Sequence, residues 1–242
     1  MGVRGTVVMM DGTVVMLHGL GCTHRSMARL ESRILAAGRP TLNIRYPSRR
    51  LPIDGLAHYV AQAITEAVPA GPLLAVTHSM GGIILRHLAD DFDWRGCVML
   101  GPPNQSSELA RLTIRIPFVR WVMGPACRDL ASSPNWPDPP QPCGLVIGTA
   151  GATWGNPPAW LGKIGRVFGP DEVHDGTVSV SEVMHDAATD VAMVRVGHTV
   201  MMNHPDVVNL VLRFLDTGSF GTTGKDQVGV EAVKSVGSLA VG

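Results

Sequence analysis

A serine lies where a buried strand is expected to give way to a helix, in the segment THSMGG (77–82). A serine at such a tight turn projects from the edge of the sheet, and small residues must flank it because the chain folds back on itself. The amides that follow start a helix, where the macrodipole favours a developing negative charge. Ser79 is therefore predicted to be a nucleophile, and the alternative is an ordinary helix N-cap.

A serine nucleophile needs a base, and two histidines late in the chain are candidates. His198 follows the strand expected at 191–196, which places it at the same edge of the sheet as Ser79. His204 lies at the head of the final helix and precedes Pro205, a position that suits capping or packing better. We expect His198 to be the base, because catalytic groups are concentrated on the loops at the rim of a rigid scaffold.

The base needs an acid to orient it, and this acid should lie between the strands expected at 144–149 and 191–196. Asp175 belongs to HDGTVSV (174–180), where the Asp-Gly pair forms a tight turn that could present the carboxylate to the rim. The requirements of the turn explain an Asp-Gly pair equally well. The acidic candidates in this stretch are Asp171, Glu172, Asp175, Glu182, Asp186 and Asp190.

A glycine-rich turn, HGLG (18–21), directly follows the first expected strand. Such a turn can aim a backbone N–H at a developing oxyanion, and the two donors would be the amides of Leu20 and Met80. The alternative is a turn that only reverses the chain. His18 and His78 lie at the same edge and are of further interest.

The elements that must position these residues alternate along the chain. Helical periodicity is expected in 27–38, 54–68, 80–90 and 206–215. Strands that do not alternate in polarity and are separated by helices are typical of a mostly parallel sheet with helices on both faces. The expected strands are 13–18, 41–46, 72–78, 97–101, 144–149 and 191–196.

Two segments differ from this pattern. Residues 102–143 are too long for a plain connection between strands, and an apolar stretch and a Pro-rich exit within them indicate an inserted cap or lid. Residues 217–242 are expected to form a poorly ordered tail after a single domain that spans 1–216.

Composition limits the possible partners of the 242-residue chain. Twenty basic and twenty acidic residues give a net charge of zero, so no basic excess exists to neutralise the phosphates of a nucleic acid. We expect no metal or other cofactor, because the histidines and cysteines lack the spacings of metal motifs. No apolar run reaches the length of a transmembrane segment, and no signal peptide is recognised, so we expect a cytoplasmic location. The oligomeric state is left open.

Together, these motifs resemble the α/β-hydrolases of the lipase/esterase type. VTHSMGGIILR (76–86) is similar to the nucleophile elbow of bacterial lipase-like enzymes, although Thr77 replaces the first glycine of GxSxG. DGTVSV (175–180) and GHTVMMNHPDVV (197–208) resemble the segments of the acid and the histidine, and GPPNQSSELA (101–110) resembles the segment after the family's sixth strand. The resemblance covers about residues 10–216. It implies a triad of Ser79, Asp175 and His198, with Leu20 and Met80 as oxyanion donors and a cap or lid after that sixth strand.

The predicted function is a cofactor-independent serine hydrolase that cleaves a small-molecule or lipid carboxylic ester through an acyl-enzyme. The alternatives are a thioesterase or acyltransferase with the same triad, or a non-catalytic binding protein that retains the fold. If 102–143 is a lid, Phe118 and Trp121 are expected to contact the acyl chain. The alternative for that segment is a cap that only completes the core.

Overall fold

In the computed structural model, described residues comprise 10–132, 135–151, 167–169 and 171–221. The centre of the molecule is a sheet of six strands that are all parallel, which confirms the predicted parallel sheet. All six strands occur where the sequence predicts them. Their spatial order is β2 (Thr41–Asn43), β1 (Thr13–Leu17), β3 (Leu73–His78), β4 (Trp94–Leu100), β5 (Cys143–Gly148) and β6 (Asp190–Val194).

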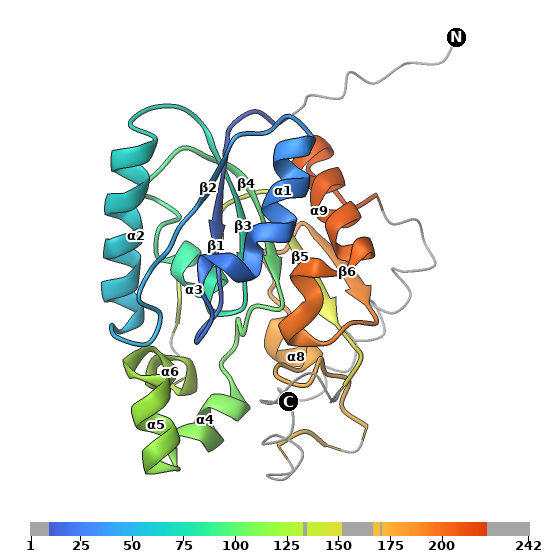
Figure 1. The fold of residues 1–242 in the computed structure, drawn as a ribbon. Coiled ribbons are helices and arrows are strands. Elements are labelled where there is room, and N and C mark those ends of the chain that lie inside the picture. Colours follow the sequence, from blue (N-terminus) through green and yellow to red (C-terminus); the bar gives the residue numbers. More distant parts are fainter. Residues whose placement is uncertain (1–9, 133–134, 152–166, 170, 222–242) are drawn as a thin grey trace.

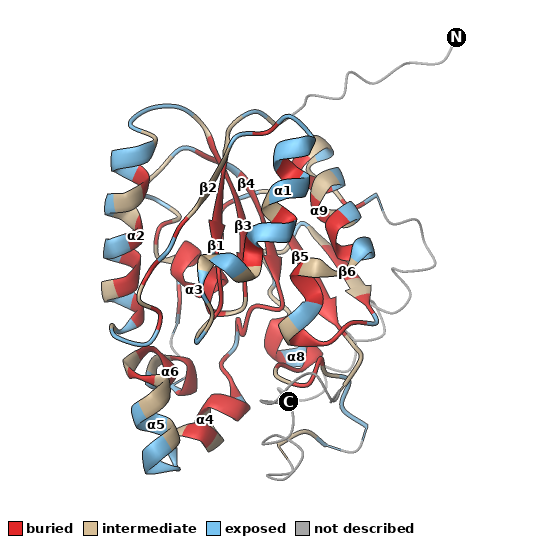
Figure 2. Cartoon of the chain, in the orientation of Figure 1, coloured by how far each residue is buried: buried red, intermediate tan, exposed pale blue. Residues whose placement is uncertain are grey.

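Both faces of the sheet are covered, because successive strand residues point to opposite sides. In β1, Val15 and Leu17 pack into the core under α2 (Ile53–Ala67) and α3 (Met80–Arg86). Val14 and Met16 pack into the opposite core, under α1 (Ala28–Ala36) and α9 (Pro205–Thr217). Figure 1 shows the two pairs of helices on either side of the sheet, and Figure 2 shows their buried stripes facing it.

The described residues of the long connection between β4 and β5 form three short helices, which we call the cap helices. They lie beyond the carboxyl ends of the strands (Figure 1). They follow β4, the fourth strand of this chain, which corresponds to the strand called the sixth in the family resemblance. They are α4 (Glu108–Ile114), α5 (Pro117–Met123) and α6 (Pro125–Ala131).

The buried side chain of Arg86 joins the connection to the sheet. At the end of α3, its guanidinium donates to the Asn104 side-chain oxygen over 3.0 Å and to the Trp136 carbonyl over 2.9 Å. Asn104 precedes the cap helices and Trp136 follows them, so one side chain fixes both ends of the segment to the helix that starts beside Ser79. Hydrogen bonds from a charged donor of this kind are among the stronger ones.

The start of the predicted tail is packed. Phe220 is buried with its ring centroid 5.0 Å from that of Phe214, and the Asp190 carboxylate accepts hydrogen bonds from the Ser219 hydroxyl and the Phe220 amide, each 2.7 Å. The fold therefore extends at least to Gly221. Residues 222–242, which make up the rest of the predicted tail, lie outside the described residues.

Two short 3-10 helices, η1 (His24–Met27) and η2 (His198–Asn203), and the one-turn helix α8 (Val180–Val183) complete the elements that surround the candidate site. Among the described residues, no helix combines the length and the apolar character that a membrane crossing requires. All four cysteines are free thiols.

Candidate active site

Ser79 occupies a strained turn between β3 and α3. Its backbone has φ 53° and ψ −125°, values that a non-glycine residue rarely adopts. The turn is held from the neighbouring strand, because the Ser79 amide donates to the Leu100 carbonyl of β4 over 2.8 Å. Strain of this kind is concentrated at functional sites, where the surroundings force an unfavourable backbone conformation.

Gly81, two residues after the serine, is required by close packing. A Cβ on Gly81 would lie 2.6 Å from the Leu17 carbonyl oxygen and 2.9 Å from that of His18, at the end of β1. On the other side of the turn, Thr77 is a fully buried β3 residue, and its hydroxyl lacks a partner among the described residues. Thr77, which replaces the first glycine of GxSxG, therefore lies at a position of β3 where the sheet has room for a side chain.

His198 and Asp175 form a buried pair. The Nδ1 atom of His198 lies 2.6 Å from Oδ2 of Asp175, and their side chains are 5% and 1% exposed. The other carboxylate oxygen accepts the amides of Thr177 and Val178 at 2.9 and 2.8 Å, so the turn predicted at Asp175 holds the carboxylate in place. The His198 amide also donates to the Asp175 carbonyl over 3.0 Å. A carboxylate with these partners keeps the Nδ1 proton on the imidazole and leaves Nε2 free to act as a base.

His78, the residue before the serine, contacts His198 of this pair. Its Nε2 atom lies 3.0 Å from the His198 carbonyl oxygen, and the two ring centroids are 4.8 Å apart. Burial lowers the pKa of His78 well below its ordinary value, so the ring is neutral and donates Nε2–H to that carbonyl. The position of His78 at this edge follows from the sequence, whereas its contact with a residue 120 positions later does not.

Two backbone amides are free to bind an oxyanion. Leu20 lies in the turn after β1, and Met80 is the first residue of α3. Within the described part of the chain, neither amide donates to a protein acceptor. The turn approaches Ser79 closely, because a Cβ on Gly19 would lie 3.2 Å from the Ser79 Cβ.

A cavity of about 300 Å³ opens between these residues and the cap helices. Ser79, His198 and Leu20 line one end of it. Much of the remaining lining is apolar, and all three cap helices contribute to it through Leu109, Ala110, Thr113, Val119, Met123, Cys127 and Leu130. An apolar cleft with a few converging polar groups is typical of a small-molecule site.

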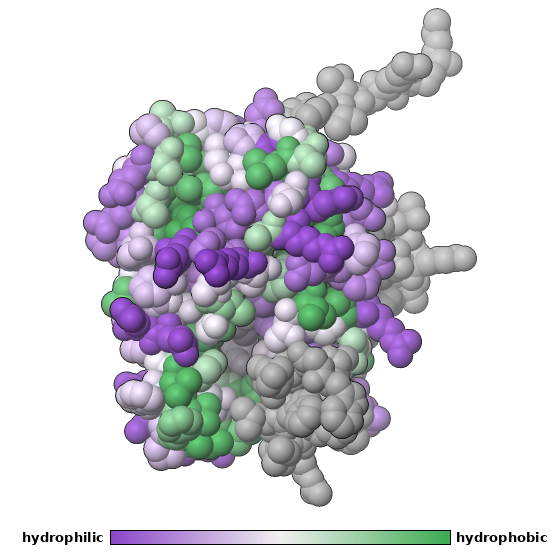
Figure 3. All heavy atoms as spheres, in the orientation of Figure 1, coloured by the Kyte–Doolittle hydropathy of each residue, from purple (hydrophilic) through white to green (hydrophobic). Residues whose placement is uncertain are grey.

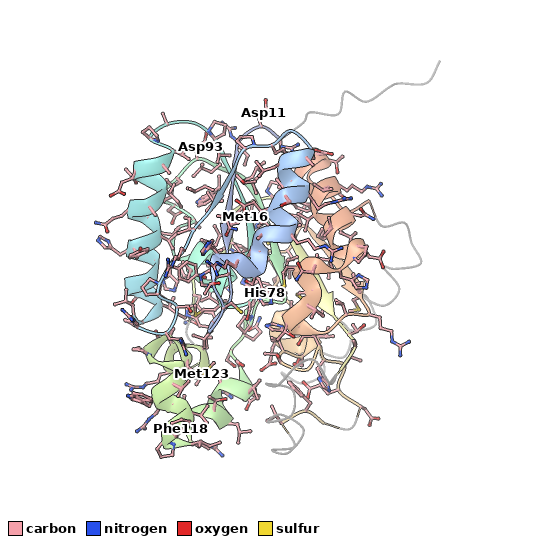
Figure 4. All side chains as sticks on the ribbon, viewed as in Figure 1. Asp11, Met16, His78, Asp93, Phe118 and Met123 are labelled. Atoms are coloured by element: carbon pink, nitrogen blue, oxygen red, sulfur yellow. The ribbon has the colours of Figure 1, made fainter. Side chains whose placement is uncertain are left out.

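The two aromatic residues expected to contact an acyl chain lie elsewhere, and this prediction is wrong. Phe118 and Trp121 are 72% and 79% exposed and do not line the cavity. In α5, Val119 and Met123 are four residues apart and share the inner face, which turns Phe118 and Trp121 outward. Figure 4 shows Phe118 at the outer end of the cap and Met123 nearer the sheet.

The competing residues have other roles. His204 is the N-cap residue of α9, with Nδ1 3.8 Å from the Asp206 carboxylate, and it does not line the cavity. The Asp190 carboxylate accepts the hydroxyl of Ser219 and so holds the segment after α9. Glu182 completes a capping box with Ser179 and accepts the Glu108 amide of α4 over 2.6 Å, and burial raises its pKa to about 7.

Groups of three or more histidine, cysteine, aspartate or glutamate side chains that could hold a metal ion are absent from the described residues.

The arrangement of strands, serine turn and histidine–carboxylate pair can be compared with solved structures. The mature lipase BlEst2 of Bacillus licheniformis aligns with a TM-score of 0.70 over 86% of this chain and 93% of its own, at 16% identity. This chain has the α/β-hydrolase fold. Two further enzymes with the α/β-hydrolase fold support the assignment. Phospholipase PlaB of Legionella pneumophila aligns with a TM-score of 0.61 over 85% of this chain and 60% of its own, at 16% identity. The metagenomic carboxyl esterase MGS0156 aligns with a TM-score of 0.56 over 81% and 67%, at 14% identity. Neither a protein-family model nor a curated protein matches the sequence.

Proposed function

We propose that this chain is a serine hydrolase that cleaves carboxylic esters with an apolar acyl group. The observation that carries the proposal is the shared cavity: the strained Ser79 and His198, whose imidazole contacts the buried Asp175, line one largely apolar space. The α/β-hydrolase fold hosts many functions, so the site rather than the fold carries the proposal.

In the proposed mechanism, Nε2 of His198 removes the hydroxyl proton of Ser79 as the oxygen attacks the ester carbonyl. The amides of Leu20 and Met80 stabilise the oxyanion, and Asp175 stabilises the imidazolium. His198 then donates its proton to the departing alcohol, which leaves an acyl-Ser79 enzyme. Water, activated by the same histidine, attacks this ester and releases the carboxylic acid and the free serine.

A panel of p-nitrophenyl esters, from acetate to palmitate, tests the proposal. The wild-type chain is expected to hydrolyse at least part of the series, and Ser79→Ala should lose on the order of 10⁴–10⁶-fold in kcat, because triad residues act as a unit. His198→Ala should cost a comparable factor, whereas His204→Ala is the matched control and should retain activity.

The alternatives give different outcomes in the same experiment. Turnover of thioesters without turnover of esters would replace the proposal with a thioesterase, and acyl transfer to an added alcohol in preference to water would indicate an acyltransferase. Full activity of Ser79→Ala, or no turnover of any acyl compound by the folded protein, would refute the proposed mechanism.

A further inference from the structure

The outer face of α5 exposes two large aromatic side chains. Phe118 and Trp121 are 72% and 79% exposed, Ile116 just before the helix is 39% exposed, and α5 contains no buried residue. The two rings lie next to each other, with centroids 6.3 Å apart. Together they present on the order of 300 Å² to solvent, an area comparable to the largest apolar patch of a typical monomer, which is often functional. Figure 2 shows α5 exposed along its outer side, and Figure 3 shows hydrophobic atoms gathered over this end of the molecule.

The segment that carries these rings has an excess of positive charge. Between Glu108 and Asp129 the sequence has no acidic residue. It has three arginines between Glu108 and Arg128, and two of them, Arg115 and Arg120, are exposed on either side of Phe118 and have no ion pair with another described residue.

The loop that contacts the end of α5 adds to this charge. A Cβ on Gly124 would overlap the Arg49 carbonyl oxygen, so the exposed residues Arg49 and Arg50 lie beside the carboxyl end of α5. We call Ile116, Phe118 and Trp121 with the four arginines Arg49, Arg50, Arg115 and Arg120 the cap patch.

The inner face of the same helix forms part of the candidate active site. Val119 and Met123 line the cavity, while Phe118 and Trp121 face solvent, so the rings of the cap patch and the apolar wall lie on opposite faces of one short helix. A surface that bound the cap patch would therefore lie next to the cavity.

We propose that the cap patch docks the protein on a lipid surface with anionic headgroups. Aromatic rings enter the headgroup boundary of a bilayer, and arginines are attracted to its negative charge. The inference rests on the proposed function in one respect: docking would deliver an ester lipid to the cavity directly from the surface.

A second copy of this chain is a poorer occupant than a lipid surface. A two-fold interface places the same patch against itself, which would bring Arg115 and Arg120 of both copies together with no acidic residue of the segment to offset them. An anionic lipid surface can bury the aromatic rings and also neutralise the charge of the arginines.

Co-sedimentation with vesicles tests the proposal. The probes are vesicles of ether-linked phosphatidylcholine, alone or mixed with ether-linked phosphatidylglycerol, which an ester hydrolase does not consume. The full chain should bind the mixed vesicles and lose binding as salt is raised. Phe118→Ala combined with Trp121→Ala should weaken binding by at least about tenfold, and each of Arg115→Gln and Arg120→Gln by about fivefold on anionic vesicles only.

The matched control is Leu35→Ala combined with Tyr59→Ala, which removes two exposed apolar side chains from α1 and α2. This control should bind vesicles as wild type does. All variants should retain the wild-type rate on soluble p-nitrophenyl acetate, because none of these residues lines the cavity.

Several results would overturn the docking proposal. They are failure of the wild type to sediment with anionic vesicles, equal binding by the aromatic variant, and a dimer in light scattering that the aromatic variant abolishes. Failure of the proposed function is distinguishable, because vesicle binding without hydrolysis of any soluble ester would leave the docking surface supported and reject the ester hydrolase.

Discussion

A methyl group added to Gly101 should disturb the candidate site without changing the identity of any proposed catalytic residue. Gly101 follows β4 with φ +54°, and its amide is fixed by the Val146 carbonyl at 2.9 Å. A Cβ at this position would lie 3.2 Å from both the Asp175 Oδ2 and the His198 Nδ1. The substitution Gly101→Ala therefore acts on the hydrogen bond that joins the proposed base and its orienting acid.

The expected effect has two parts. Alanine in the left-handed region costs about 1–2 kcal/mol of backbone free energy, which should lower the stability of the fold by that amount. The methyl contacts are shorter than the roughly 3.5 Å that is optimal for such atoms, so the pair must move by about 0.3 Å. Since a misplacement of about 1 Å can cost about a hundredfold in rate, this shift should lower kcat by roughly fivefold.

The control is Gly38→Ala, at the end of α1. Gly38 has φ +82° with no atom within 4 Å of its Cβ position. The substitution Gly38→Ala therefore imposes a similar backbone strain but brings the added methyl group into contact with no other residue. Urea unfolding should show similar losses of stability for the two variants, while kcat on p-nitrophenyl acetate should fall only for Gly101→Ala. If Gly101→Ala keeps the wild-type kcat, or if Gly38→Ala loses as much, the assignment of the His198–Asp175 pair to the reaction is wrong.

Three further predictions concern the acid, the supporting histidine and the cavity wall. Asp175→Asn should leave the fold intact and lower kcat by about four orders of magnitude, because the imidazole would lose its orienting acceptor; an unchanged kcat would remove Asp175 from the mechanism. The pKa of His78 is lowered from 6.5, so the unfolded chain binds a proton first as the pH falls. Wild type should therefore lose up to about 1.4 kcal/mol of unfolding free energy per pH unit below about pH 6.5 that His78→Asn does not lose, as measured by urea unfolding; parallel curves would contradict the neutral state of His78. Met123→Ala should lower kcat/KM for octanoate more than for acetate, by roughly fourfold for each methylene of the acyl chain that the shortened side chain no longer covers, whereas Phe118→Ala should change neither ester; equal losses on both esters would show that Met123 only stabilises the cap.

The sequence predicts the sheet and the position of the serine well because both depend on local patterns. Each buried strand is a short apolar run between helices, and the sharp turn at Ser79 follows from a serine and two glycines at the end of one such run. His198 follows from the same logic, since it begins η2, four residues after the end of the last strand.

The acid and the cap depend on contacts that local patterns do not contain. Asp175 is one of six acidic residues in its stretch, and only the fold shows its carboxylate 2.6 Å from His198. The inner and outer faces of α5 are both apolar, so periodicity cannot tell Val119 from Phe118, and the tertiary packing decides which one lines the cavity. The hydrogen bond from His78 to His198 joins the end of β3 to η2, which follows β6 at the far edge of the sheet, and no local sequence pattern reveals such a contact.

Covalent labelling by a fluorophosphonate tests the proposed serine chemistry most directly, because the reagent reacts with a serine only when a base activates it and an oxyanion site is present. We predict one adduct in the intact mass of the wild type, located on Ser79 by peptide mass spectrometry, and no adduct on Ser79→Ala or His198→Ala. His204→Ala should label at the wild-type rate. Absence of labelling on the folded wild-type protein, or an adduct on any other residue, would contradict the assignment of Ser79 as the nucleophile.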